Sequence, residues 1–414
     1  MAVISTSEAV HTTSHTDSKQ SYMPALISLA VLYFMMGFIT CLNDTLVPFF
    51  KKGFTLTYSQ SSLVQFYFFL TYGIMSVPAG KIVSRTGYKN GMVLGFAVAA
   101  FGGLLFYPAS VFHQYILFLA ALFVIAIGIV ILQVAANPYI TALGPAKTAS
   151  ARLTLIQGIG SAGTTVAPLF GAHFILSRLQ ESGASSEAVR YPYLGIAALL
   201  LIIAFAVSRL SLPVISTVNN AQTLPTGKQG SIFSFRQLKF GTIGIFMYVG
   251  AEVSIGTFLT NYIVDLLGIP ENAANNYVAF YWGGMLVGRL MGAGLLRVLK
   301  PAMVLSVCAA LAVVLILISV NTTGMLAVWT MIAVGLCNAV MFATIFSLSV
   351  QGVGQRTTAA SGLLSTAICG GAIISYAQGF LKDHGTWQIA FLIPVACYLY
   401  ILFYGLNGYK AKQQ

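Results

Sequence analysis

Charged residues are scarce in this 414-residue chain: they make up 7% of it, against roughly 25% in an average soluble domain. Acidic residues are the scarcest, with nine Asp and Glu against 21 Lys and Arg. A soluble globule of this size cannot cover its surface with so few charges, which excludes a cytosolic enzyme, a nucleic-acid binder and a disordered protein. The chain also lacks nucleotide-loop, HExxH and GxSxG motifs and any CxxC or Cys/His cluster, so we expect no enzymatic activity, no metal and no organic cofactor.

The chain instead has long apolar runs, since 57% of its residues are hydrophobic and its mean hydropathy is +0.86. A helix needs about 20 apolar residues to cross a bilayer. Twelve segments meet that need: 24–49, 59–82, 90–110, 113–141, 150–177, 191–212, 239–267, 272–299, 302–320, 324–350, 357–380 and 386–408. The longest polar interruption follows the sixth. We therefore predict an all-α membrane protein with six-helix halves at 24–212 and 239–408, a linker at 213–238, and tails at 1–23 and 409–414.

Basic residues predict the orientation of this bundle. If both termini are cytoplasmic, only five of the 21 Lys and Arg fall outside: Lys51, Lys52, Arg178, Arg190 and Lys382. Cytoplasmic loops of membrane proteins carry an excess of Lys and Arg. The prediction is therefore a protein integral to a plasma membrane, of the bacterial inner-membrane type, whose cytoplasmic face meets anionic lipid.

The two halves also resemble each other at an offset of 208 residues. Gly80 then pairs with Gly288, and Gly163 with Gly371, at corresponding places in the two sets of helices. Parallel repeats of six helices, related by a pseudo-two-fold axis, are similar to the plan of the major facilitator superfamily.

Two acidic residues lie well inside apolar segments, where each costs about 2.5–3.5 kcal/mol on insertion scales. They are Asp44 and Glu252, and they are separated by the same 208 residues. Neither has an obvious base nearby in the sequence. We interpret both as ion-coupling residues that face a central cavity; the alternative is a structural hydrogen bond or ion pair to a neighbouring helix.

Uncharged polar side chains accompany these acids. Amides supply both donors and acceptors, which suits a neutral, polyhydroxylated ligand, and an indole offers an apolar face to a sugar ring. An interhelical hydrogen bond is the alternative for any one amide. The predicted substrate-binding residues are Asn43, Gln65, Gln133, Asn137, Gln157, Asn261, Asn276, Trp282 and Asn338.

Four basic residues are predicted to act in gating. Arg85 and Lys89 belong to an inner loop, Gly80-Lys-Ile-Val-Ser84-Arg85-Thr-Gly87-Tyr-Lys89, similar to the superfamily signature G-x-x-x-D-R-x-G-x-K but with Ser84 in place of Asp. Arg152 and Arg289 are placed near inner helix ends. No Lys or Arg is expected at mid-helix, which argues against an anionic substrate.

Several motifs resemble the fucose:proton symporter family and its glucose/galactose branch. They are Asn43-Asp44-Thr-Leu-Val-Pro48, Gln133-Val-Ala-Ala-Asn137-Pro138, Tyr248-Val-Gly-Ala-Glu252, and the segments 342–347 and 361–374. The resemblance covers residues 24–408 and implies sugar import driven by an ion gradient. It implies a coupling and recognition role for Asp44. Gln133 stands where the fucose branch has Glu, which favours the hexose branch and leaves the second acidic role to Glu252.

The leading hypothesis is thus a monomeric secondary transporter that imports a glucose- or galactose-type monosaccharide with a proton by alternating access. The alternatives are sodium coupling, or uptake of fucose or an N-acetylhexosamine by the same fold. A drug exporter of this fold would be expected to have fewer amides, and a nutrient sensor would be expected to have a long cytoplasmic tail or signalling domain.

Overall fold

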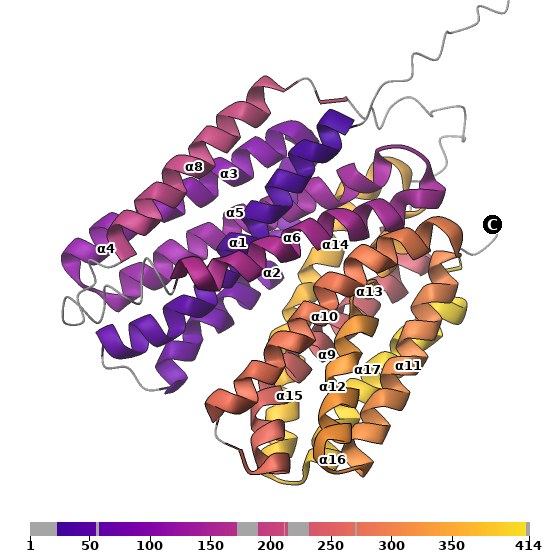
Figure 1. Cartoon of the computed structure of the whole chain (residues 1–414). Coiled ribbons are helices and arrows are strands. Elements are labelled where there is room, and N and C mark those ends of the chain that lie inside the picture. The colour runs from indigo at the N-terminus through magenta and orange to yellow at the C-terminus, as the bar shows by residue number, and fades with distance from the viewer. Residues whose placement is uncertain are drawn as a thin grey trace, which may run out of the picture.

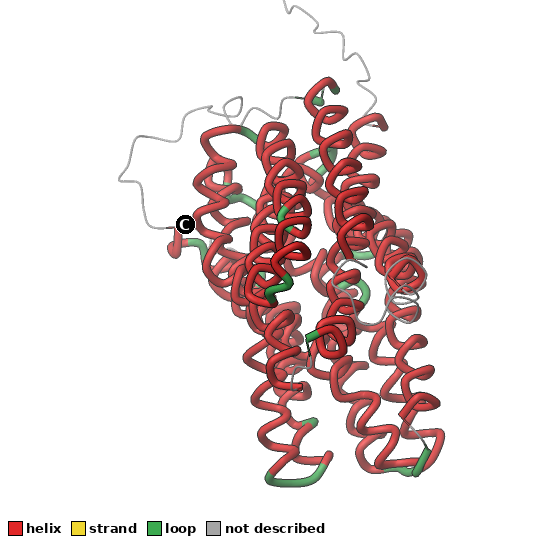
Figure 2. The backbone as a smooth tube through the Cα atoms, turned by 90° about the vertical axis from the view of Figure 1, so that its left-hand side faces the viewer, coloured by secondary structure: helices red, strands yellow, loops and turns green. Residues whose placement is uncertain are grey.

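The computed structural model describes residues 23–54, 58–171, 189–210, 212–213, 232–269 and 271–410; some side chains inside these ranges, among them 43–53 and 58–65, are not described. Every regular element in these ranges is helical, which confirms the all-α class, and Figure 2 shows only helices and short loops. Most of the predicted tails and of the predicted linker lies outside the described residues.

The first half consists of long helices that cross the molecule in alternating directions. Their bounds are α1 (Met23–Gly53), α2 (Tyr58–Thr86), α3 (Tyr88–Leu104) continued by α4 (Phe106–Phe112), α5 (Tyr115–Ala142), the turn η1 (Ala146–Thr148), α6 (Ala149–Gly171) and α8 (Arg190–Arg209). Gly87, with φ of 82°, makes the tight turn between α2 and α3 that a residue with a Cβ would resist.

The second half repeats the pattern but breaks several crossings. Its elements are η4 (Ile232–Ser234), α9 (Arg236–Leu267), α10 (Glu271–Val298), α11 (Pro301–Asn321), α12 (Gly324–Asn338) and α13 (Met341–Val350), η5 (Gly354–Arg356), α14 (Thr357–Thr366), η6 (Ala367–Cys369), α15 (Gly370–Asp383), α16 (Trp387–Ala390), α17 (Leu392–Phe403) and η7 (Tyr404–Gly408). The segments predicted as single helices at 324–350, 357–380 and 386–408 are thus interrupted. The first interruption directly follows Asn338, whose side chain bonds to neighbouring helices rather than to its own.

Ten described stretches are long and apolar enough to cross a membrane by length and composition. Helices α6 and α10 are not among them, although they lie within the bundle and pack against each other. These two helices are therefore less apolar than an ordinary membrane span, and the Arg289 guanidinium of α10 bonds to the Ser161 hydroxyl of α6 across their contact.

The halves meet chiefly along two pairs of helices, α6 with α10 and α2 with α14, with smaller contacts of α6 with α13 and of α5 with α14. In Figure 1 the indigo-to-magenta helices of the first half lie beside the orange-to-yellow helices of the second, and the two groups diverge towards the end that bears α16. Close approach between α2 and α14 depends on glycine, because a Cβ on Gly362 would lie 2.7 Å from the carbonyl oxygen of Ser76. Small residues permit such backbone contact between membrane helices.

Three hydrogen bonds join the halves near the end where α1 begins and η7 ends, which we call the termini side. The Ser361 hydroxyl donates to the Val134 carbonyl at 3.1 Å, and the Thr358 hydroxyl donates to the Tyr88 hydroxyl at 3.2 Å. The hydroxyls of Ser150 and Ser347 also bond to each other. The described protein is therefore closed on the termini side.

Candidate functional site

A buried ion pair lies at the middle of the second half. Glu252, midway along α9, has its Oε1 atom 3.8 Å from Nη2 of Arg289 on α10, and the two side chains are 13% and 19% exposed. Tyr248 lies one turn before Glu252 on the same face of α9, within electrostatic range of the carboxylate. The ion pair to a neighbouring helix, which was the alternative interpretation of Glu252, is therefore present, with a partner that is distant in the sequence. The expectation that no Arg lies at mid-helix is wrong, because Arg289 reaches inward from α10, nine residues before that helix ends.

A chain of hydrogen bonds fixes the backbone beneath this pair. Tyr281 donates to the carbonyl oxygen of Glu252 at 3.1 Å, Asn338 donates through Nδ2 to the Tyr281 hydroxyl at 2.9 Å, and Tyr398 donates to Oδ1 of Asn338 at 2.7 Å. All three side chains are fully buried. These hydrogen bonds join α9, α10, α12 and α17, and they engage both polar ends of Asn338, so we interpret this amide as a residue that positions Glu252.

The first half presents amides whose polar atoms have no protein partner. The Tyr33 hydroxyl on α1 bonds to Oδ1 of Asn137 on α5, which leaves Nδ2 of Asn137 buried and unpaired. One turn earlier on the same face of α5, Oε1 of Gln133 is also buried without a partner, as is Oε1 of Gln157 on α6. Unpaired buried polar atoms cost about 1–3 kcal/mol each, so these three atoms mark a place where a polar ligand is favoured.

Arg289 connects the polar groups of the two halves. Its Nη1 donates to the hydroxyl oxygen of Ser161 on α6, while the Ser161 hydroxyl itself donates to the Gln157 carbonyl at 3.2 Å. Tyr33 lies within electrostatic range of the same guanidinium. The structure therefore gathers one polar centre from both halves, made of Tyr33, Gln133, Asn137, Gln157, Ser161, Tyr248, Glu252 and Arg289.

Trp282 borders this polar centre on the side away from the termini. It lies two turns from Arg289 on the same face of α10 and packs on Gly256 of α9, where a Cβ would lie 2.6 Å from the indole ring. Gly256 is one turn beyond Glu252 on the same face of α9, and the Trp282 side chain is 45% exposed. An aromatic face is thus available one turn above the carboxylate.

Other predicted contacts are not brought to the polar centre. Asn261 is exposed and lies half a turn around α9 from Glu252, and Asn276 is exposed near the start of α10. The side chains of Asn43, Asp44 and Gln65 lie outside the described residues, although their backbones belong to α1 and α2. Their roles stay predictions.

The predicted gating residue Arg152 has a different set of partners. Its guanidinium donates to the carbonyls of Ile140, Thr141 and Pro145 at 3.2, 2.9 and 2.9 Å, and also to the Thr148 hydroxyl. The guanidinium thereby satisfies the carbonyls of Ile140 and Thr141 at the end of α5. It also adds a bond to the Pro145 carbonyl of the following loop, which accepts from the Thr148 amide as well, so all these bonds stay within one half.

Arg85 and Lys89 lie on either side of Gly87 on the termini side. In the part of the chain that the structure describes, neither makes a salt bridge. Ser84 donates to the carbonyl of Lys81 at 2.8 Å, a bond within its own helix. A gating role for Arg85 and Lys89 stays a prediction.

Tyr33 and Ser161 are site residues that sequence reasoning missed, together with the inward orientation of Arg289. Each lies in an apolar or small-residue stretch with no distinguishing motif. The available signal was the polarity of α6 and α10, which makes them poor membrane spans and marks the faces that need partners.

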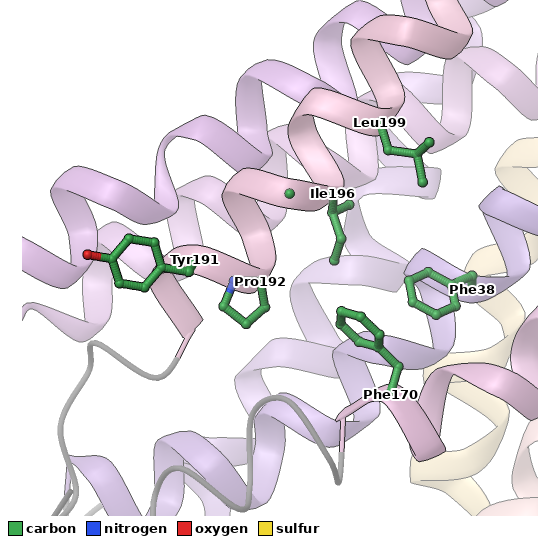
Figure 3. A pocket seen from close by; sticks show the side chains of 7 residues that line it. Phe38, Phe170, Tyr191, Pro192, Ile196 and Leu199 are labelled. Carbon is green, nitrogen blue, oxygen red and sulfur yellow. The ribbon is translucent and has the colours of Figure 1, made fainter.

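An apolar pocket of about 410 Å³ lies elsewhere, within the first half (Figure 3). Side chains from α1, α6 and α8 surround it, and its lining is Phe38, Phe170, Tyr191, Pro192, Gly195, Ile196 and Leu199. None of the residues of the polar centre lines it. Its chemistry suits hydrocarbon and not a polyhydroxylated ligand, so it is separate from the candidate site.

Comparison with known proteins shows the family and the fold to which this chain is similar. The model of the Major Facilitator Superfamily matches residues 29–376. The chain is 48% identical to the glucose/galactose transporter of Brucella abortus over 99% of each protein, and 33% identical to the L-fucose-proton symporter of Escherichia coli over 93% of each. The crystal structure of the transporter FucP in the outward conformation is 30% identical, with a TM-score of 0.84 over 94% of this chain and 99% of that one.

Proposed function

The chain belongs to the major facilitator superfamily, and from that membership and its polar centre we propose that it imports a hexose of the glucose/galactose type together with a proton. The observation that carries the proposal is the set of unpaired amide atoms in the first half, which Tyr33 and Ser161 connect to the carboxylate and guanidinium of the second. Such a set offers donors and acceptors to several hydroxyl groups at once.

Each group has a separate role in this proposal. Gln133, Asn137 and Gln157 bind sugar hydroxyls, and Trp282 covers an apolar face of the ring. Glu252 and Asp44 bind the coupling proton, while Asn338 and Tyr281 position Glu252. Asn43, Gln65, Asn261 and Asn276 remain further predicted contacts.

We also propose that the termini side faces the cytoplasm, in the inner membrane of a bacterium, and that the monomer is the functional unit. The excess of Lys and Arg on that side supports the orientation. The described state is then closed to the cytoplasm, with its site reached from outside. Transport proceeds when the halves rock about the polar centre and open it to the other side.

Uptake of labelled sugars by proteoliposomes tests this function. We expect glucose and galactose to accumulate when the outside is acidic, and a protonophore to abolish accumulation. Fucose and N-acetylglucosamine serve as comparison sugars, and an imposed sodium gradient replaces the proton gradient in a parallel series. Accumulation that follows sodium and ignores the protonophore would refute proton coupling, and preference for another sugar would refute the hexose assignment.

A further inference from the structure

Arg289 is shared between the two halves. Its distance of 3.8 Å to Glu252 is longer than the roughly 2.7–2.9 Å of a direct charge-assisted hydrogen bond. Its other partner, Ser161, belongs to the opposite half and accepts a direct hydrogen bond. The guanidinium is therefore not committed to the carboxylate of its own half.

The first half offers Arg289 a second acceptor. Oε1 of Gln157 is buried without a partner and lies one turn from Ser161 on the same face of α6. Between them, Gly158 packs against Arg289, since a Cβ on Gly158 would lie 3.4 Å from the Cβ of Arg289. Nε of Arg289 is likewise a buried donor with no partner, so donor and acceptor are both available at the α6–α10 contact.

Among the described groups that face Glu252, Arg289 is the one that carries a charge. In the described part of the chain, the titratable groups facing Glu252 are Arg289 and Tyr281 of α10, Tyr248 of α9 and Tyr398 of α17. The three phenols are neutral at physiological pH. A change in the charge of Glu252 is therefore felt first by the guanidinium.

We propose that Arg289 converts the charge of Glu252 into closure of the cytoplasmic side, an inference that rests on the proposed proton-coupled function. While Glu252 is ionised, Arg289 is divided between that carboxylate and α6. When Glu252 takes a proton from the external solution, the buried cation loses its anion and needs other acceptors, which Ser161 and Gln157 provide. The protonated, sugar-free protein is thereby held closed across α6 and α10.

Sugar binding then weakens the closed contact between α6 and α10. A hexose that engages Gln157 competes with Arg289 for the same acceptor and weakens the α6–α10 contact. The halves part only when proton and sugar are both bound, and the proton leaves Glu252 for the cytoplasm after they open. This arrangement prevents a proton from crossing alone, as symport requires. The proton favours the state that is closed to the cytoplasm, and only sugar shifts the balance towards the open state, since a ligand moves such an equilibrium by its differential affinity for the two states.

The first test measures sugar-independent proton entry. Proteoliposomes with an entrapped pH dye receive a potassium diffusion potential, and the wild type is compared with Ser161→Ala. Loss of one hydrogen bond to a charged group corresponds to a change on the order of tenfold in an equilibrium, so we expect proton entry to rise about tenfold. Entry equal to that of the wild type overturns the proposal, provided that Ser161→Ala purifies as a monodisperse protein.

The second test measures closure without sugar or gradient. Spin labels at Asn90 and Lys300, exposed on the termini side of the two halves, report their separation after replacement of the native cysteines. Glu252→Gln mimics the protonated acid and should increase the closed population, and Ser161→Ala should cancel that increase. The matched control is Ser150→Ala, which breaks the Ser150–Ser347 bond across the same interface but is remote from Glu252.

The control should lower closure by the same factor whether or not the Glu252→Gln substitution is present. Additive effects of Glu252→Gln and Ser161→Ala, within about twofold, would overturn the proposal because independent sites add. This cycle uses no sugar, so it distinguishes the two ideas. A wild type that fails to transport hexose while the cycle shows coupling refutes the proposed function, and a transporting wild type with an additive cycle refutes the inference.

Discussion

Asn338 and Gln133 are both buried amides near the polar centre, and the structure predicts opposite effects of replacing them by leucine, which has a similar volume. Asn338 donates at 2.9 Å and accepts at 2.7 Å, so both of its ends are used within the protein. Oε1 of Gln133 has no protein partner. The stability of each variant, and its stabilisation by sugar, should therefore distinguish the roles of the two residues.

The expected magnitudes follow from these partners. Asn338→Leu leaves the buried Tyr398 hydroxyl without an acceptor and removes the donor to Tyr281. One unpaired buried hydroxyl costs about 1–3 kcal/mol, while hydrogen bonds between membrane helices average about 0.6 kcal/mol. We expect a loss of about 1–3 kcal/mol. Gln133→Leu removes an unpaired polar atom, and we expect no loss of stability in the absence of sugar.

Thermal unfolding in detergent, with and without galactose, measures both effects. A ligand at about 100 times its Kd adds about 2.7 kcal/mol to the native state, so binding is visible as a rise in Tm. Asn338→Leu should lower the Tm in the absence of sugar but keep a rise with sugar. Gln133→Leu should keep the Tm and lose the rise. Tyr398→Phe, which breaks one of the two bonds and keeps the ring, should have a smaller effect than Asn338→Leu.

One result would refute this reasoning. If Asn338→Leu is as stable as the wild type and has lost its response to galactose, Asn338 contacts the sugar directly, and its assignment as a positioning residue is wrong.

Three further predictions concern packing and capping. Gly163→Val should abolish recovery of folded protein in size-exclusion chromatography, because a Cβ there would lie 2.1 Å from the Phe34 carbonyl oxygen. Gly195→Ala is the control and should behave as wild type, because a Cβ there would have no atom within 4 Å. Arg152→Ala should lower the Tm. Arg152→Lys should recover little of the lost Tm, since one ammonium cannot span the three carbonyls that the guanidinium reaches. A Tm of Arg152→Lys equal to that of the wild type would contradict this geometry. Gly256→Val should displace the Trp282 ring and so raise the KM for sugar. It should also change the tryptophan fluorescence, because the chain has only three tryptophans. An unchanged KM would show that Trp282 does not contact the sugar.

Most of the helices and their order could be predicted from the sequence because long apolar runs mark them, although such runs do not show where a helix is interrupted. The segment predicted at 239–267, for example, is α9 (Arg236–Leu267). The importance of Glu252 could also be predicted, since a carboxylate within an apolar helix needs a partner or water. Sequence distance could not show that Arg289 is this partner, because the contact depends on how α10 is rotated against α9.

The amides illustrate the same limit. In the sequence, all four predicted contacts are carboxamides within apolar segments, and nothing distinguishes them: Gln133, Asn137, Gln157 and Asn338. In the structure, the first three have unpaired polar atoms and Asn338 has none. Tyr398, which occupies the Asn338 carbonyl, lies 60 residues further along the chain. Hydrogen-bond partners of this kind follow from tertiary packing, and no local pattern encodes them.

The insufficient apolarity of α6 and α10 has a consequence for biosynthesis. Each helix, taken alone, is poorly suited to release from the translocon into lipid, and in the folded protein the two pack against each other, with Arg289 of α10 bonded to Ser161 of α6. Since α10 is synthesised more than a hundred residues after α6, the earlier helix must wait for the later one or shelter among its own neighbours. A truncated chain that stops directly after the first half, and so lacks α10, should therefore be a substrate for membrane quality-control proteases, even though the helices of the first half are all present.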